Sequence, residues 1–106
     1  MIDGVEPLTD RTVRLVERLF AAADAPRAQG LLVEECGTNL PFCETQDAVA
    51  LERVRFAVLM LSGGDMTKLR AMVDHAKEDW RDVLVWAGFG YSLTEHDRWA
   101  QAVLEP

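Results

Sequence analysis

The hydrophobic pattern of the chain is centred on residues 46–62, QDAVALERVRFAVLMLS. In the first half of this stretch the apolar residues recur at three- and four-residue spacing, at Val49, Ala50, Val54, Ala57 and Val58. This spacing predicts an amphipathic helix, with the charged residues Glu52, Arg53 and Arg55 on its other side. Residues 56–61 are apolar throughout, so we expect this part of the helix to be buried on every face.

Two glycines follow the central stretch, in the sequence Ser62-Gly63-Gly64-Asp65. Glycine favours the left-handed conformation with which helices often end, and aspartate is a good N-cap, so one helix is predicted to close here and another to begin. In an alternative interpretation, residues 55–61 are a buried strand and the loop after them resembles the phosphate-binding loop of the N-type ATP pyrophosphatases. The pattern of that family is SGGxDS, whereas this chain has SGGDMT, with its aspartate one place early and Thr67 at the final serine.

Two shorter helices are predicted before the central one, after a loose leader at residues 1–8. Thr9 suits the N-cap of the first helix, whose apolar stripe is Val13, Val16, Leu19, Phe20 and Ala23. Asp24-Ala25-Pro26 ends this helix and opens the second, since proline is tolerated in a first turn. The second helix should end at Gly37 and bury Ala28, Leu31, Leu32 and Cys36. The aperiodic residues 38–45 are expected to form a packed loop.

The C-terminal half predicts further helices. Asp65 is expected to cap one that buries Met66, Leu69, Met72, Val73 and Ala76. The apolar stripe of this helix continues with the same helical period into the next segment, which Asp79 is expected to cap and Gly88 to end. The two segments are therefore either one helix or two helices with a small kink between them. Thr94 is expected to cap a last helix, with Trp99, Ala102 and Val103 on its apolar side.

These elements predict a single all-α domain over residues 1–106. We expect an irregular orthogonal bundle of five or six short helices around the central buried helix at about 46–62. The chain is long enough for one modest core, and its 49% hydrophobic and 27% charged residues are typical of a folded domain.

Charge and composition narrow the classes of partner. The net charge of −7 argues against nucleic acid and against an anionic membrane surface, because phosphate groups require a basic face. The central apolar run is far shorter than the roughly 20 residues of a membrane span. No secretory signal is visible at Met1-Ile2-Asp3-Gly4, and the two cysteines then indicate reduced thiols in the cytoplasm.

The residues that usually carry chemistry are isolated along the sequence. Cys36 and Cys43 lack the short spacing and the second ligand pair of a zinc site, so we interpret them as structural thiols. His75 and His96 each stand next to one aspartate, with no nucleophile motif nearby. We therefore expect no catalytic residue, no metal site and no cofactor.

Residues 79–89, DWRDVLVWAGF, resemble a segment of small, uncharacterised bacterial helical proteins, and this resemblance implies no activity. The segment also opens an aromatic-rich region. Val85 and Trp86 lie off its core stripe, and the last helix is too short to cover them as well. A second copy of the chain would cover this face, through an interface of Trp86, Val85, Phe89, Tyr91 and Trp99. Alternatively, these aromatic residues complete the core.

The function predicted from the sequence is protein–protein association by a small cytoplasmic helical domain. The favoured form of this association is self-association as a homodimer. One alternative is an acidic inhibitor, such as an immunity protein or antitoxin, that masks a basic partner. A second alternative is a fragment of a nucleotide-binding enzyme that uses the SGGD loop at residues 62–65.

Overall fold

Five α-helices form the part of the chain that the computed structural model describes, residues 8–37, 48–90 and 94–105. They are α1 (Asp10–Leu19), α2 (Ala25–Glu35), α3 (Ala48–Ser62), α4 (Met66–Ala87) and α5 (Glu95–Leu104). None of these residues lies in a strand, so the all-α prediction is confirmed. The alternative interpretation of residues 55–61 as a strand is wrong, because they lie within α3. No helix among the described residues is long and apolar enough to cross a membrane.

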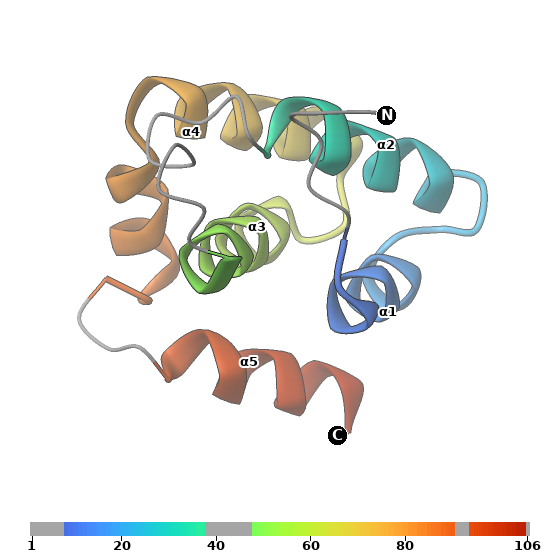
Figure 1. Cartoon of the computed structure of the whole chain (residues 1–106). Helices are drawn as coiled ribbons and strands as arrows, with labels where there is room; N and C mark the ends of the chain where they lie inside the picture. The colour runs from blue at the N-terminus through green and yellow to red at the C-terminus, as the bar shows by residue number, and fades with distance from the viewer. Residues whose placement is uncertain (1–7, 38–47, 91–93, 106) are drawn as a thin grey trace, which may run out of the picture.

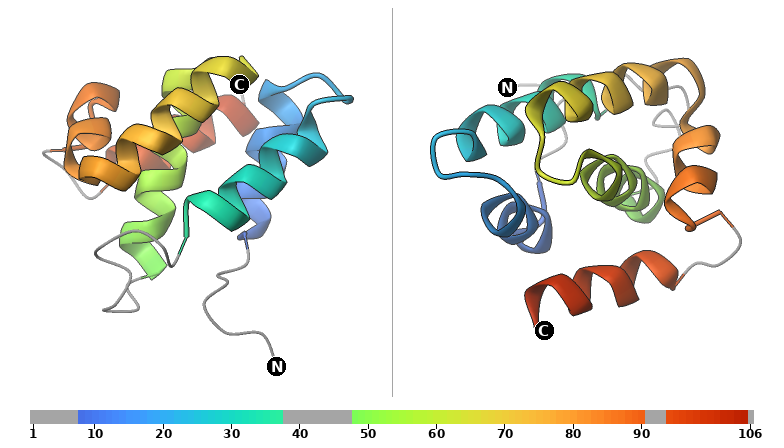
Figure 2. Two further views of the ribbon diagram at one scale, coloured as in Figure 1. Left: turned by 90° about the horizontal axis from the view of Figure 1, so that it is seen from above. Right: turned by 180° about the vertical axis from the view of Figure 1, so that it is seen from behind.

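Helix α3 lies at the centre of the bundle. Figure 1 looks nearly along its axis, with α2 and α4 above it, α1 to one side and α5 below. The two views of Figure 2 keep this arrangement, and in the left view, seen from above, the first part of α4 crosses over α3. The core positions of the helix are at most 3% exposed: Leu51, Val54, Phe56, Ala57, Val58 and Leu59. The predicted central helix is therefore confirmed over Ala48–Ser62, while residues 46 and 47 lie outside the described residues.

Three positions of α3 differ from the expectation. Val49 is 61% exposed and Met60 is 39% exposed, although Leu51 and Leu59 near them are buried. Arg55, expected on the polar side, is buried. Its Nε donates a 2.9 Å hydrogen bond to the carbonyl oxygen of Cys36, the C-cap residue of α2. A guanidinium is tolerated in the interior here because it meets the carbonyl end of a helix, where the helix dipole favours positive charge.

The first two helices begin as predicted. The Thr9 hydroxyl accepts a 3.2 Å hydrogen bond from the amide of Thr12 and caps α1, while Pro26 lies in the first turn of α2. Leu8 packs against the core, so this last residue of the predicted loose leader is held, and residues 1–7 lie outside the described residues. The buried side of α1 is rotated from the prediction towards Thr12, Leu15, Val16 and Phe20, because α2, α3 and α5 all contact this helix.

The predicted burial of residues is confirmed along α2 but not in the turn before it. All the residues expected inside α2 or at its end are buried: Ala28, Leu31, Leu32 and Cys36. Ala23, placed on the buried stripe of α1, is exposed in the turn between the helices. The predicted loop at 38–45 falls outside the described residues.

Helix α4 changes direction at Asp79, and this bend of the helix is visible on the left side of Figure 1. The backbone of Asp79 leaves the helical region, with φ −156° and ψ 97°, and its carboxylate accepts a 3.1 Å hydrogen bond from the amide of Arg81. Asp79 is thus an N-cap inside a continuous run of turns, and α4 has two arms that meet at a kink. The second arm ends at Gly88, whose φ is +83°. The amide of Phe89 returns to the carbonyl of Leu84 at 2.8 Å, which completes a glycine-stopped helix end.

Candidate functional site

The second arm of α4 carries two large apolar side chains on the surface of the described structure. Val85 is 49% exposed and Trp86 is 51% exposed. Their neighbours Val83 and Leu84 are buried in the core. The helical period therefore leaves Val85 and Trp86 off the buried stripe of the helix, as the sequence predicted. We call these two residues, together with His75, the Trp86 face.

Contacts across the kink hold Trp86 in place. The indole ring packs against the ring of His75, with centroids 4.5 Å apart and planes tilted by 49°. The Nε2 atom of His75 lies 3.1 Å from a carboxylate oxygen of Asp82, within hydrogen-bond distance. His75 belongs to the first arm, whereas Asp82 and Trp86 belong to the second. The kink at Asp79 is what brings these three side chains together.

The other residues predicted for the interface are placed differently. Phe89 is only 2% exposed and belongs to the core of the chain. Trp99 is half-buried, with its ring 6.1 Å from the rings of both Phe56 and Phe89. Tyr91 lies outside the described residues. Each of the two alternatives drawn from the sequence, an exposed interface or completion of the core, thus holds for different residues. Phe89 and Trp99 complete the core, while Val85 and Trp86 form an exposed face.

A second cluster joins three helices on another side of the bundle. One nitrogen of Arg11, on α1, lies 2.9 Å from the Glu52 carboxylate of α3 and 2.6 Å from the Asp97 carboxylate of α5. The Thr9 hydroxyl donates a 2.8 Å hydrogen bond to the other oxygen of Glu52. The guanidinium of Arg11 also lies over the ring of Phe56, 5.2 Å from its centroid. This network connects α1, α3 and α5 through a single cation.

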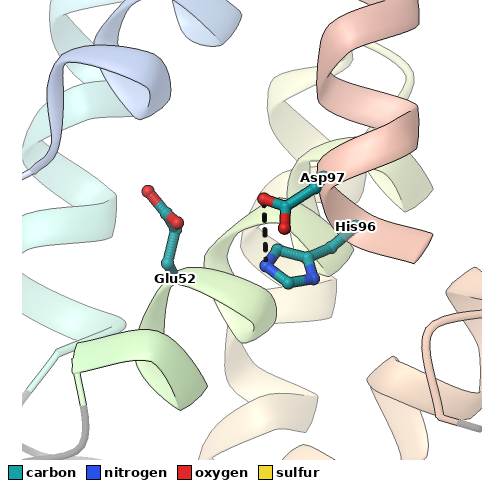
Figure 3. Close-up of side chains that lie close together, drawn as sticks. All are labelled: Glu52, His96 and Asp97. Carbon is teal, nitrogen blue, oxygen red and sulfur yellow. Dashed lines mark ion pairs between the residues drawn. The ribbon is translucent and has the colours of Figure 1, made fainter. Parts of the chain in front are cut away.

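His96 completes this cluster from the inside, as Figure 3 shows. The side chain is 2% exposed, and its ring lies 5.7 Å from that of Phe56 and 6.3 Å from that of Phe89. Its Nε2 atom faces Asp97 at 3.5 Å, and its Nδ1 atom is buried without a hydrogen-bond partner. Desolvation by burial lowers the pKa of His96, because the charged imidazolium is disfavoured away from water.

Sequence reasoning missed this cluster because it treated each histidine as local to its own helix. Glu52 is 44 positions from His96, and no local period connects them. One signal was present: His96 precedes Trp99 by three residues and so shares its helical stripe. The predicted structural role of Cys36 fits its burial, whereas Cys43 lies outside the described residues.

Comparison with protein-family models, curated proteins and solved structures found no match to this chain. The resemblance of residues 79–89 to bacterial helical proteins thus stays a prediction.

Proposed function

We propose that the chain acts in the cytoplasm through protein association, and that its first partner is a second copy of itself. The observation that carries this proposal is the exposure of two adjacent large apolar side chains, Val85 at 49% and Trp86 at 51%. Removing apolar surface from water contributes roughly 25 cal/mol per Å², and tryptophan is among the residues that most often dominate an interface.

The Trp86 face is already ordered before any partner arrives. The His75 ring packs against the indole side chain, and the Asp82 carboxylate lies within hydrogen-bond distance of that His75 ring. Gly88 and the hydrogen bond from Phe89 fix the end of the helix that carries it. Ordering an interface side chain costs about 0.5–1.5 kcal/mol, so an ordered tryptophan binds with less loss of entropy.

A second copy is the simplest occupant of this face. In a two-fold pair each copy presents the same patch, so Val85 and Trp86 of one chain meet their counterparts without any further surface feature. The net charge of −7 opposes the approach of two copies. Salt screens this repulsion over about 8 Å at physiological ionic strength, so added salt is expected to strengthen the pair.

Sedimentation velocity at several protein concentrations tests the proposal. Wild type is expected to shift from monomer to dimer with concentration, and Trp86→Glu is expected to remain a folded monomer. Met60→Glu is the matched control, because Met60 is a partly exposed apolar residue of α3 rather than of the Trp86 face. A wild type that stays monomeric at all concentrations contradicts self-association. So does a dimer that Trp86→Glu leaves intact.

The salt dependence separates self-association from the acidic-inhibitor alternative. A basic partner would bind this acidic chain more weakly as salt rises, whereas a pair held by apolar contact strengthens. Among the described residues, several carboxylates pair with bases of the same chain, as Glu35 does with Lys77 and Glu95 with Arg98. Carboxylates that are already paired within the chain are less available to a basic partner. Self-association is therefore the function proposed.

A further inference from the structure

We infer that Glu52, His96 and Asp97 form a binding site for a divalent transition-metal cation of the Zn²⁺ type, and that the guanidinium of Arg11 competes with this cation for the two carboxylates. The site lies between α3 and α5, apart from the Trp86 face, and it does not depend on the function proposed above.

The geometry suits a small cation. One ligand atom from each of the three residues lies within 4.8 Å of the other two. Zinc binds nitrogen and oxygen ligands at about 2.0–2.2 Å, which places the ligands of a tetrahedral ion about 3.4 Å apart. The Nε2 atom of His96 and the carboxylate of Asp97 are already 3.5 Å apart. Only Glu52 has to approach further, through rotation of its flexible side chain.

His96 gives the independent indication of a ligand. A ring that is 2% exposed has no hydrogen-bond partner at Nδ1, and the contact of Nε2 with Asp97, at 3.5 Å, exceeds the usual hydrogen-bond length of about 2.7–3.2 Å. Buried polar groups normally have partners. The Nε2 atom faces the carboxylates, as Figure 3 shows, and a neutral imidazole offers a lone pair there. A cation at this point would give the Nε2 atom a partner at bonding distance, whereas the Nδ1 atom points away from the carboxylates.

Arg11 shows that the space between the carboxylates accepts positive charge. A single nitrogen of its guanidinium bridges both groups, at 2.9 Å from Glu52 and 2.6 Å from Asp97. The side chain of Arg11 is 39% exposed, so it has a route into solvent when a cation arrives. Two carboxylates carry two negative charges, of which the guanidinium balances one and a dication balances both.

The ligand set also indicates the class of cation. One imidazole and two carboxylates form a mixed nitrogen and oxygen set, which suits Zn²⁺, whereas Mg²⁺ and Ca²⁺ prefer oxygen ligands. The Thr9 hydroxyl holds the outer oxygen of Glu52 at 2.8 Å and leaves the inner oxygen directed at the cluster. Such support orients a metal-binding carboxylate. A fourth position would be left for water.

Titration calorimetry with ZnCl₂ tests the inference. Wild type is expected to bind one Zn²⁺ per chain, and Arg11→Met to bind it at least tenfold more tightly because the competing cation is gone. Adding Asp97→Asn to Arg11→Met should weaken binding at least tenfold. Asp97 is half exposed, so this variant is expected to fold. Glu52→Gln in the same background is the second variant, with folding checked by circular dichroism.

The matched control is His75→Ala, which removes the other histidine–aspartate pair of the described residues, His75 with Asp82. This variant is expected to leave Zn²⁺ affinity unchanged. The inference is overturned if wild type shows no zinc binding, or if Arg11→Met binds no more tightly than wild type. It is also overturned if His75→Ala abolishes binding, or if the folded Asp97→Asn and Glu52→Gln variants keep it.

Discussion

The Nη2 atom of Arg53 donates a 2.6 Å hydrogen bond to the carbonyl oxygen of Phe89, 36 positions further along the chain. This bond ties the first half of α3 to the residue that follows the glycine end of α4. Phe89 is buried, and the hydrogen bond to its carbonyl group is partly buried. The contact fixes the position of the second arm of α4 and, with it, the Trp86 face.

We expect Arg53→Met to destabilise the fold by about 1–3 kcal/mol, because it leaves a carbonyl group in the interior without this donor. Urea unfolding followed by circular dichroism measures the change. Arg81→Met is the control, since Arg81 is 73% exposed and its ion pair with Asp79 lies on the surface. Equal stabilities for the two variants would mean that the Arg53 bond contributes little.

Val58→Asp is expected to prevent folding. Val58 is completely buried in the middle of α3, and an unpaired carboxylate there costs several kcal/mol against a total stability of roughly 5–15 kcal/mol. Met60→Asp places the same group two residues along, where the side chain reaches solvent at 39% exposure. That variant should still melt cooperatively. A Val58→Asp variant that melts within a few degrees of wild type would contradict the central role of α3.

Substitution by alanine should have opposite effects on the stability of the fold at two glycines, Gly64 and Gly30. Gly64 has φ +88°, and a Cβ atom there would lie 2.3 Å from the carbonyl oxygen of Leu19. The left-handed conformation alone costs a non-glycine residue about 1–2 kcal/mol, so Gly64→Ala should destabilise by more than this. Gly30 lies inside α2 with open space around it, and Gly30→Ala should stabilise by about 0.4–1 kcal/mol. Thermal melts of both variants test the pair, and a neutral Gly64→Ala would contradict the close approach of the loop to α1.

The ion pair between α2 and α4 gives a pH-dependent prediction. The Nζ atom of Lys77 lies 2.6 Å from Glu35, and this hydrogen bond lowers the pKa of the Glu35 carboxyl from its ordinary value. Since the folded pKa is the lower one, the stability from this pair is present above the unfolded pKa and is lost as pH falls through the folded value. Carbon NMR should give Glu35 a titration midpoint below that of an ordinary glutamate, and Lys77→Met should return it towards the ordinary value. Identical midpoints in the two proteins would contradict the pairing.

Local signals in the sequence predicted the ends of the helices well. Thr9 and Asp65 cap α1 and α4 with their side chains, and Gly88 stops α4 in the left-handed conformation. Each of these outcomes depends on residues within one turn of the cap. Thr94 precedes α5 as expected, but its side chain makes no capping hydrogen bond, so its N-cap role is positional.

Positions that depend on distant partners were harder to predict. Arg55 appears polar in its own helix, yet its partner is the Cys36 carbonyl, 19 positions away. Val49 has the right phase for burial and is exposed, because phase identifies a face but not whether another helix covers it. His96 is the clearest case in the candidate metal site, since its burial depends on Phe56 and Phe89, which lie on other segments.

The pairing of α1 with α5 has a consequence for the synthesis of the chain. Arg11 meets Asp97 across 86 positions, and Arg18 reaches the carbonyl of Leu104 across the same separation. On a ribosome α1 emerges early, but this partner does not exist until Asp97 has been added. Until then the side of α1 that meets α5 lacks its partner, and the contact can form only after a loop of this length closes. The order of synthesis thus makes α5 the element that completes the fold.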